Sequence, residues 1–390
     1  MLIKNSNQRQ LDKLSLVAVF YVCTELRRLK LKKLYICEYP YVLYKVLIKA
    51  ALNDNGDIVD IVLTNRMDRM TRLITQLKRS NLFGNVYFYD LRNLNLKYDM
   101  FLHKFDENIV RQRLYELKIW GYFYKIANSK KLRNMEWNFN LDQYDEICCT
   151  DGTFIFEAYF SAHKREHILI EHARDVHIKK NYSFFASVFH TIEQIIDKYD
   201  ILMGIGIASK YCTTMEVNSD MGNKQADFLK NKKIRIWNVE EHIEQLTPQK
   251  RELILDVYIR SYLGGFDYDD KYNLLLTNPL YIDGDVSSEQ EQIEVYLEMI
   301  RQYKLDDGNK LLIKAHPRDN TDYRVISHAI IIDSMVSSEI LCISKRLKLH
   351  TVVTLYSSSA QAFKNHAEKI IQVADSEDEV IEYCKKVLKN

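Results

Sequence analysis

The chain contains little glycine, little proline and no excess of charge, and these shortages exclude several classes of protein. Its 390 residues include only 11 Gly and 4 Pro while 47% are hydrophobic, so collagen-like, low-complexity and disordered chains are excluded. Lys and Arg number 55 against 53 Asp and Glu, a net charge of +2, which predicts no nucleic-acid partner. At this length we expect two globular domains or one large α/β unit.

Paired cysteines and long apolar runs are missing as well. The seven cysteines form no C-x-x-C pair and are odd in number, a pattern typical of a reducing cytosol. The apolar stretch 14–22 is much shorter than the roughly 20 residues of a membrane-spanning helix, so we expect a cytoplasmic protein. The basic, leucine-rich segment 27–34 is interpreted as a solvated helix face, with attachment to anionic lipid headgroups at the inner face of the plasma membrane as the alternative.

Apolar runs of strand length alternate with segments of helical period along most of the chain. This alternation predicts an α/β fold with two Rossmann-like, doubly wound domains, each a parallel sheet covered by helices. The looser stretch 239–270 separates the two, and we set the domains at residues 1–255 and 256–390. The expected strands are residues 33–37, 57–63, 84–90, 145–152, 167–172, 200–205 and 233–237, then 273–280, 310–317, 329–333, 351–356 and 369–373. The clearest expected helices are residues 106–128, 288–303, 337–346 and 377–388.

Ligands of open parallel sheets bind beyond the carboxyl ends of the strands, and one such end carries a histidine among basic residues. In KLLIKAHPRD, Lys314, His316, Pro317 and Arg318 follow a strand directly. Cationic neighbours lower the pKa of an imidazole unless an anion is bound. We therefore predict that His316 handles a phosphate group; a histidine that merely caps the strand is the alternative.

A second strand end carries three consecutive serines. In TVVTLYSSSAQAF, Ser357, Ser358 and Ser359 follow the strand and open a segment with helical character. Backbone N–H groups and hydroxyls at a helix N-terminus bind anions without a metal ion. The serines are predicted to bind a phosphate, with simple helix capping or a serine-rich loop as the alternatives.

Carboxylates that could act as a general base lie at two further strand ends. Asp151-Gly152 closes the strand 145–152, and Asp283 and Asp285 follow the strand 273–280 in the other domain. A carboxylate held on a tight turn beside a cleft can accept a proton. Asp-Gly is also a common turn dipeptide, so both loops stay open as candidates.

Other motifs are weaker, and we expect neither a metal ion nor a cofactor. His163, His167, His172 and His177 lie close in sequence, but a strand at 167–172 would place its two histidines on opposite faces. The D-x-D patterns at 267–270 and 283–285 are short enough to arise by chance. The GIGIAS segment, 204–209, lacks the third glycine of a dinucleotide-binding fingerprint, and no P-loop motif is present.

The His-Pro dipeptide at a strand end, the later Ser-rich turn and the acidic-Gly pair together resemble motifs of the bacterial sialyltransferases. The chain is most similar to the lipooligosaccharide sialyltransferases, glycosyltransferase family 52. The segment YICEYPYVLYKVLIKA (35–50) resembles that family's first strand and helix. The resemblance spans residues 33–375, so residues 1–32 form an extra N-terminal segment.

The resemblance implies a GT-B-like fold, with an N-terminal acceptor-side domain and a C-terminal nucleotide-donor domain facing across a cleft. It implies metal-independent, inverting transfer of sialic acid from the co-substrate CMP-sialic acid to a terminal sugar of a bacterial surface glycan. His316 would contact or protonate the departing phosphate, and Asp151 or Asp285 would deprotonate the acceptor. The expected donor-binding residues are Asn278, Lys314, Pro317, Arg318, Ser357, Ser358 and Ser359.

The family's acidic-acidic-Gly motif reads Thr150-Asp151-Gly152 in this chain, which leaves the identity of the base open. The expected partners are a nucleotide-sugar donor, a glycan or glycolipid acceptor, a peripheral membrane contact and a second copy of the chain. The alternatives are a GT-B transferase for another nucleotide sugar and a non-catalytic, nucleotide-binding assembly protein.

Overall fold

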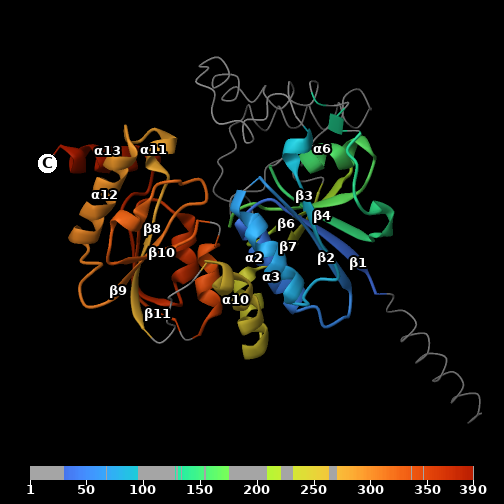
Figure 1. The fold of residues 1–390 in the computed structure, drawn as a ribbon, viewed down its shortest axis with the longest axis horizontal. Coiled ribbons are helices and arrows are strands. Elements are labelled where there is room, and N and C mark those ends of the chain that lie inside the picture. Colours follow the sequence, from blue (N-terminus) through green and yellow to red (C-terminus); the bar gives the residue numbers. More distant parts are fainter. Residues whose placement is uncertain are drawn as a thin grey trace, which may run out of the picture.

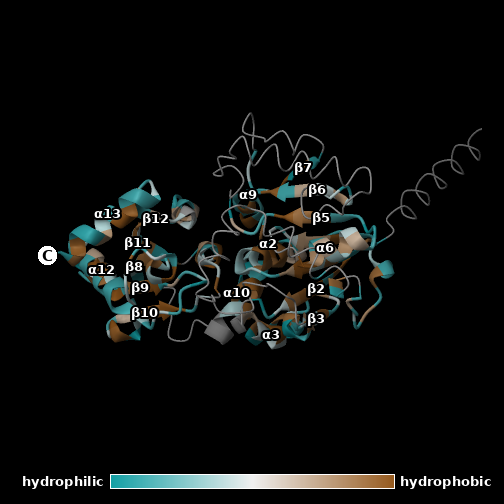
Figure 2. Cartoon of the chain, turned by 90° about the horizontal axis from the view of Figure 1, so that it is seen from above, coloured by the Kyte–Doolittle hydropathy of each residue, from teal (hydrophilic) through white to brown (hydrophobic). Residues whose placement is uncertain are grey.

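The computed structural model shows two parallel sheets side by side with α10 (Pro248–Tyr262) between them (Figure 1). It describes residues 30–66, 68–94, 128, 131–132, 134–152, 155–174, 209–220, 232–262, 270–334, 336–345 and 347–389. Hydrophobic residues concentrate in the strands of both sheets, whereas α12 (Glu289–Gln302) and α13 (Glu377–Leu388) carry many hydrophilic residues (Figure 2). Within the described residues, no helix combines the length and hydropathy needed to span a bilayer.

The first sheet, within the described residues, has seven strands in the order β3-β2-β1-β4-β5-β6-β7, all parallel. The chain builds outward from β1 to β3, returns to place β4 beside β1, and builds outward again, so the topological switch point lies between β1 and β4. The strands are β1 (Lys32–Cys37), β2 (Ile58–Thr64), β3 (Val86–Tyr89), β4 (Glu146–Thr150), β5 (His167–Ile170), β6 (Cys212–Val217) and β7 (Lys233–Ile236). Its described α-helices are α2 (Pro40–Ala51), α3 (Ile74–Arg79), α6 (Ile155–Ala162) and α9 (Val239–Glu244).

The second sheet repeats this topology with five described strands in the order β10-β9-β8-β11-β12, all parallel. Its switch point lies between β8 and β11. The strands are β8 (Lys271–Leu276), β9 (Lys310–Lys314), β10 (Ala329–Ile332), β11 (Lys348–Thr354) and β12 (Ala367–Gln372). Besides α12 and α13, the domain contains α11 (Leu280–Asp283) and the 3-10 helices η7 (Tyr323–Val325), η8 (Ser338–Ile343) and η9 (Ser358–Phe363).

The predicted GT-B-like α/β fold with two Rossmann-like, doubly wound domains is confirmed. Most strands lie where apolar runs predict them, because strands buried on both faces need continuous apolar sequence. The strand β6 was missed, since its sequence CTTMEV mixes polar and apolar residues. The expected strand 200–205 and helix 106–128 lie outside the described residues.

Some local predictions were wrong. The helix expected at 337–346 and the helix opened by the serines are short 3-10 helices, η8 and η9. The basic segment 27–34 is not a helix face at its end, because Lys32 to Leu34 begin β1; residues 27–29 lie outside the described part.

The helix α12 begins at a capping box and buries one face that includes a polar residue. The Ser288 side chain accepts a hydrogen bond from Glu291 N, and Glu291 Oε2 accepts one from Ser287 N. Leu297 is exposed, whereas Gln292 is fully buried on the same face as Val295, Tyr296 and Met299. A buried glutamine in an otherwise apolar stripe indicates polar partners inside the domain.

The two domains share one continuous apolar core, with α10 in contact with α2, α3 and η8. The predicted domain boundary at residue 255 lies within this helix. The Arg251 side chain donates to Ile343 O at 3.0 Å, and the Tyr44 hydroxyl donates to Glu339 O at 3.0 Å. Both hydrogen bonds are buried, and they join α10 and α2 to the η8 segment of the second domain.

Candidate active site at the carboxyl ends of the two sheets

In the second domain, the loops after β9, β8 and β11 lie next to one another because these three strands are neighbours in the sheet. They carry His316, the pair Thr277-Asn278 and the serine turn that begins at Ser357. The middle loop lies at the switch point, where ligands of doubly wound sheets bind. The topology therefore brings the predicted histidine and serines to one edge, on either side of the β8 loop.

His316 is held in a tight turn that determines which ring nitrogen carries the proton. Its carbonyl accepts from Asp319 N at 2.9 Å, and its own N–H donates to Thr277 Oγ1 at 3.2 Å. The ring Nδ1 accepts a hydrogen bond from Arg318 N at 3.2 Å. Since Nδ1 is an acceptor, the neutral ring carries its hydrogen on Nε2.

The surroundings of His316 favour this neutral form. Burial, and to a smaller extent the charges of Arg318 and Lys314, lower the pKa of His316 to about 3. The predicted direction is confirmed, although burial outweighs the basic neighbours. At neutral pH the ring is an N–H donor through Nε2 and not a proton source.

The two cations that flank His316 are both engaged within the protein. The buried Lys314 ammonium donates to Ala315 O at 2.5 Å and to Ser334 O at 3.2 Å, and burial lowers its pKa to about 8. Arg318 makes two hydrogen bonds to the Asp283 carboxylate, at 2.7 and 3.1 Å. Asp283 is thereby paired, and the exposed Arg318 can reach a bound anion only by leaving or sharing this carboxylate.

The serine turn is fixed by Asn278. Asn278 Nδ2 donates to Tyr356 O at 2.7 Å, and its Oδ1 accepts from Tyr356 N at 3.3 Å. The Ser357 side chain accepts from Ser359 N at 3.3 Å and so caps η9. Asn278, predicted to bind the donor, uses its side-chain amide to hold the serine turn in place.

In the first domain, Asp151 lies at the carboxyl end of β4, beside the other switch point. Asp151 is only 7% exposed, and its Oδ2 lies 3.6 Å from His172 Nδ1, beyond the end of β5. Gly152 has a φ of +78°, the left-handed conformation that glycine adopts most easily. Its N–H donates to Glu157 Oε1 at 2.8 Å, so the turn that presents Asp151 is pinned to α6.

A chain of side chains that follow β1 and β2 leads away from this carboxylate–imidazole pair. The rings of Tyr39 and His172 lie 5.5 Å apart, and the Arg66 guanidinium lies 5.8 Å from the Tyr39 ring. Arg66 Nη1 is 3.5 Å from the buried Glu38 Oε1. The sequence prediction missed Tyr39 and Arg66, although their positions just after strands could have marked them.

The third candidate carboxylate, Asp285, follows α11 in the same domain as His316. Burial raises its pKa, and the charges of Asp283 and Glu377 raise it further. Asp285 N donates to Leu280 O at 2.8 Å, which closes the loop. Asp151 and Asp285 therefore belong to different domains, whereas Asp283 is occupied by Arg318.

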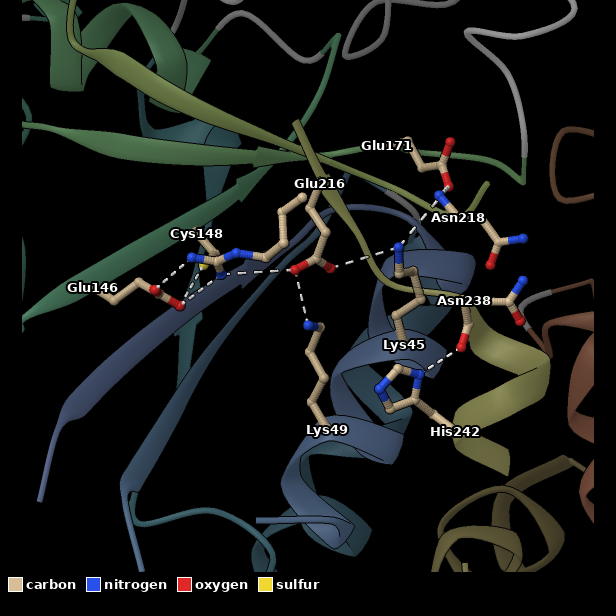
Figure 3. A network of polar contacts seen from close by, with 10 residues as sticks. Lys45, Lys49, Glu146, Cys148, Glu171, Glu216, Asn218, Asn238 and His242 are labelled. Carbon is tan, nitrogen blue, oxygen red and sulfur yellow. Dashed lines mark hydrogen bonds and ion pairs between the residues drawn. The ribbon is translucent and has the colours of Figure 1, made fainter. Parts of the chain in front are cut away.

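A further group of charges is buried under α2 (Figure 3). Glu216 of β6 lies 2.9 Å from the Lys49 ammonium and 3.6 Å from that of Lys45. Lys45 is also 3.9 Å from Glu171, and Arg235 is 3.8 Å from Glu216. Burial alone would raise the pKa of Glu216, but Lys49 and Lys45 outweigh it and lower that pKa. Lys45, Glu171 and Glu216 are almost fully buried, so this network links α2 to β6 and to the end of β5 inside the domain.

Within the described residues, no three His, Cys, Asp or Glu side chains are grouped in a way that could hold a metal ion. His167 is buried, its Nδ1 lies 3.1 Å from Arg165 O, and burial lowers its pKa to about 4. Asp270 pairs with Lys310. His177, Asp267 and Asp269 lie outside the described part of the chain.

Two doubly wound domains, with polar residues at both switch points, define a two-domain α/β protein of the Rossmann-like class. The family model of glycosyltransferase family 52 matches residues 177–378, just over half of the chain. The chain belongs to glycosyltransferase family 52.

Individual relatives are more distant. The chain is 38% identical over 91 residues to an uncharacterized protein of Haemophilus influenzae, a match that spans 23% of this chain and 28% of that protein. Among solved structures it is similar to the spinosyn rhamnosyltransferase SpnG, at 10% identity and a TM-score of 0.46, with 92% of each chain covered. UDP-GlcNAc 2-epimerase from Neisseria meningitidis matches at 10% identity and a TM-score of 0.39, also with 92% of each chain covered. With both TM-scores below 0.5, the fold assignment depends on the strand orders of the chain itself.

Proposed function

We propose that the chain is an inverting, metal-independent glycosyltransferase that moves sialic acid from CMP-sialic acid to a terminal sugar of a bacterial surface glycan, a lipooligosaccharide or a capsule. Membership of glycosyltransferase family 52 supports glycosyl transfer. The observation that carries the proposal is the placement of His316, whose Nδ1 accepts from Arg318 N and leaves Nε2 for a ligand, across the β8 loop from the serine turn.

The donor side of this reaction must stabilise charge on a leaving phosphate. As the bond between the anomeric carbon and the phosphate oxygen breaks, its electron pair remains on CMP. Fixed N–H and O–H donors can stabilise this charge in place of a divalent cation, and one well-placed donor contributes about 3 kcal/mol. We assign this role to His316 Nε2–H and to the hydroxyls of the serine turn. The phosphate would also raise the pKa of His316 from its value of about 3.

The acceptor side requires a base across the sugar from the leaving phosphate, as in inverting glycosyl chemistry generally. We assign this role to Asp151 because it lies in the opposite domain from His316. Its carboxylate takes the proton of the acceptor hydroxyl while the acceptor oxygen bonds to the anomeric carbon. Asp285, in the same domain as His316, is the alternative base.

The proposal includes three partners besides the nucleotide sugar. The acceptor is a glycan or glycolipid, and the site of action is the cytoplasm at the inner face of the plasma membrane. In the basic segment 27–34, Arg27, Arg28 and Lys30 support contact with anionic lipids. Lys32 and Lys33 of the same segment lie in β1 and pair with Asp60 and Asp57. A second copy of the chain, in a homodimer, is proposed as well.

Incubation of the protein with labelled CMP-sialic acid and a panel of small acceptor sugars tests the proposal. We expect transfer from CMP-sialic acid and none from UDP-hexoses, and strong loss of transfer in His316→Ala. Turnover of a UDP-sugar without turnover of CMP-sialic acid would identify a different donor. Full activity in His316→Ala would remove this histidine from the mechanism.

A further inference from the structure

The loop after β8 contacts both neighbouring loops through two adjacent residues. Thr277 contacts the His316 turn on the β9 side, and Asn278 contacts the serine turn on the β11 side. Because β8 lies between β9 and β11, this dipeptide fixes the position of each loop relative to the other.

The Thr277 hydroxyl connects the His316 backbone to a buried carboxylate. Thr277 Oγ1 accepts from His316 N at 3.2 Å and donates to Asp319 Oδ2 at 3.1 Å. Asp319 is 4% exposed, and it also accepts from the Tyr323 hydroxyl at 2.6 Å and from Thr321 N at 3.0 Å. An ionised carboxylate accepts all of these bonds and directs the threonine hydroxyl toward itself. The remaining lone pairs of Thr277 Oγ1 then face the His316 N–H.

Two residues of α12, one turn apart, form hydrogen bonds with Asp319 and with the β8 loop. Gln292 Nε2 lies 3.1 Å from both carboxylate oxygens of Asp319. The Tyr296 hydroxyl accepts from Asn278 N at 2.6 Å and donates to Asn278 O at 2.9 Å. Both side chains are fully buried, and residues four apart share one helix face. The polar stripe of α12 therefore serves the β8 loop and the His316 turn.

We propose that Thr277 and Asp319 are positioning residues, which hold the His316 turn so that Arg318 N donates to Nδ1 and Nε2 remains the ring N–H donor. The hydroxyl–carboxylate pair acts through His316, and neither residue needs to touch the substrate. The role in transfer rests on the proposed function, whereas the effect on the ring does not. Preorganised donors of this kind matter because a displacement of about 1 Å can reduce rates on the order of 100-fold.

The test compares Thr277→Val, which keeps the shape and removes the hydroxyl, with Thr277→Ser, which keeps the hydroxyl. Nitrogen-15 NMR of labelled histidine reads the His316 tautomer without any substrate, with His316→Gln used to assign the signal. We expect wild type and Thr277→Ser to show the hydrogen on Nε2, and Thr277→Val to show a mixture of tautomers. With CMP-sialic acid, kcat/KM should fall on the order of 100-fold in Thr277→Val, mainly through kcat, and recover in Thr277→Ser.

Thermal unfolding of each variant shows whether it is folded. If Thr277→Val does not fold, Asp319→Asn is used in its place, and the same changes in tautomer and kcat/KM are expected. Thr354→Val is the matched control, because it removes a buried threonine hydroxyl of β11 for which the described residues offer no hydrogen-bond partner, and it should leave the tautomer unchanged. If wild type transfers no sialic acid, the proposed function fails while the NMR result still decides the positioning role. A folded Thr277→Val with the wild-type tautomer would overturn the inference.

Discussion

The depressed pKa of His316 predicts a pH-dependent contribution to stability that can be isolated by one substitution. The folded-state pKa is about 3, against about 6.5 for an unfolded histidine. A group whose pKa is lowered on folding contributes stability above its unfolded pKa, and this contribution is lost as the pH falls toward the folded pKa. Between about pH 7.5 and pH 5, protonation of the unfolded chain alone would cost about 2 kcal/mol. Because the ring is partly exposed, we take this figure as an upper bound.

The assay is urea unfolding of wild type and His316→Gln at both pH values. The glutamine variant does not titrate at this position. When the free energies of unfolding of the two proteins are subtracted, the contributions of all groups that titrate alike in both cancel, and the contribution of His316 remains. His167, whose pKa is lowered to about 4, is one such group. We expect the stability of wild type relative to His316→Gln to fall by up to about 2 kcal/mol on acidification. An equal difference at both pH values would show that His316 titrates normally, and the neutral-donor role would then lose its basis.

Four other substitutions test three separate parts of the structure. Glu216→Gln leaves Lys45 and Lys49 buried without their shared carboxylate and should destabilise the fold by about 3 kcal/mol in urea unfolding; an unchanged midpoint would contradict the role of this network. Asp151→Asn should lower kcat with little change in the KM for CMP-sialic acid, while Asp285→Asn stays active; the reverse result would move the base to Asp285. Asn278→Ala removes the two hydrogen bonds that hold the serine turn and should raise the donor KM by about tenfold. An unaltered KM would show that these hydrogen bonds do not support donor binding.

Much of the fold was predictable because parallel strands buried on both faces have a continuous apolar sequence. β2 and β9 show this clearly, since nearly all of their residues are buried. β6 was missed because its two threonines and Glu216 interrupt the pattern. Glu216 is tolerated there only because lysines from α2 and Arg235 from β7 surround it, and a sequence does not show which distant charges will meet.

The candidate site was predictable as individual residues but not as a set of contacts. His316 and the serines follow strands, and the rule for parallel sheets places such residues at one edge. That Asn278 clamps Tyr356 and that Thr277 joins His316 to Asp319 depends on β8 lying between β9 and β11. The spatial order of strands is decided by the packing of the whole domain. For the same reason the buried Gln292 could not be distinguished from a solvent-facing residue of α12.

The binding of CMP in excess chelator, measured by calorimetry for wild type and His316→Ala, tests the central claim most directly. If a neutral imidazole donor and the serine turn hold the phosphate without a cation, wild type binds CMP under these conditions. The variant should then bind about ten to one hundred times more weakly, as expected for the loss of one hydrogen bond to a charged group. Equal affinity of the two proteins, or CMP binding that appears only when Mg²⁺ or Mn²⁺ is added, would contradict the account.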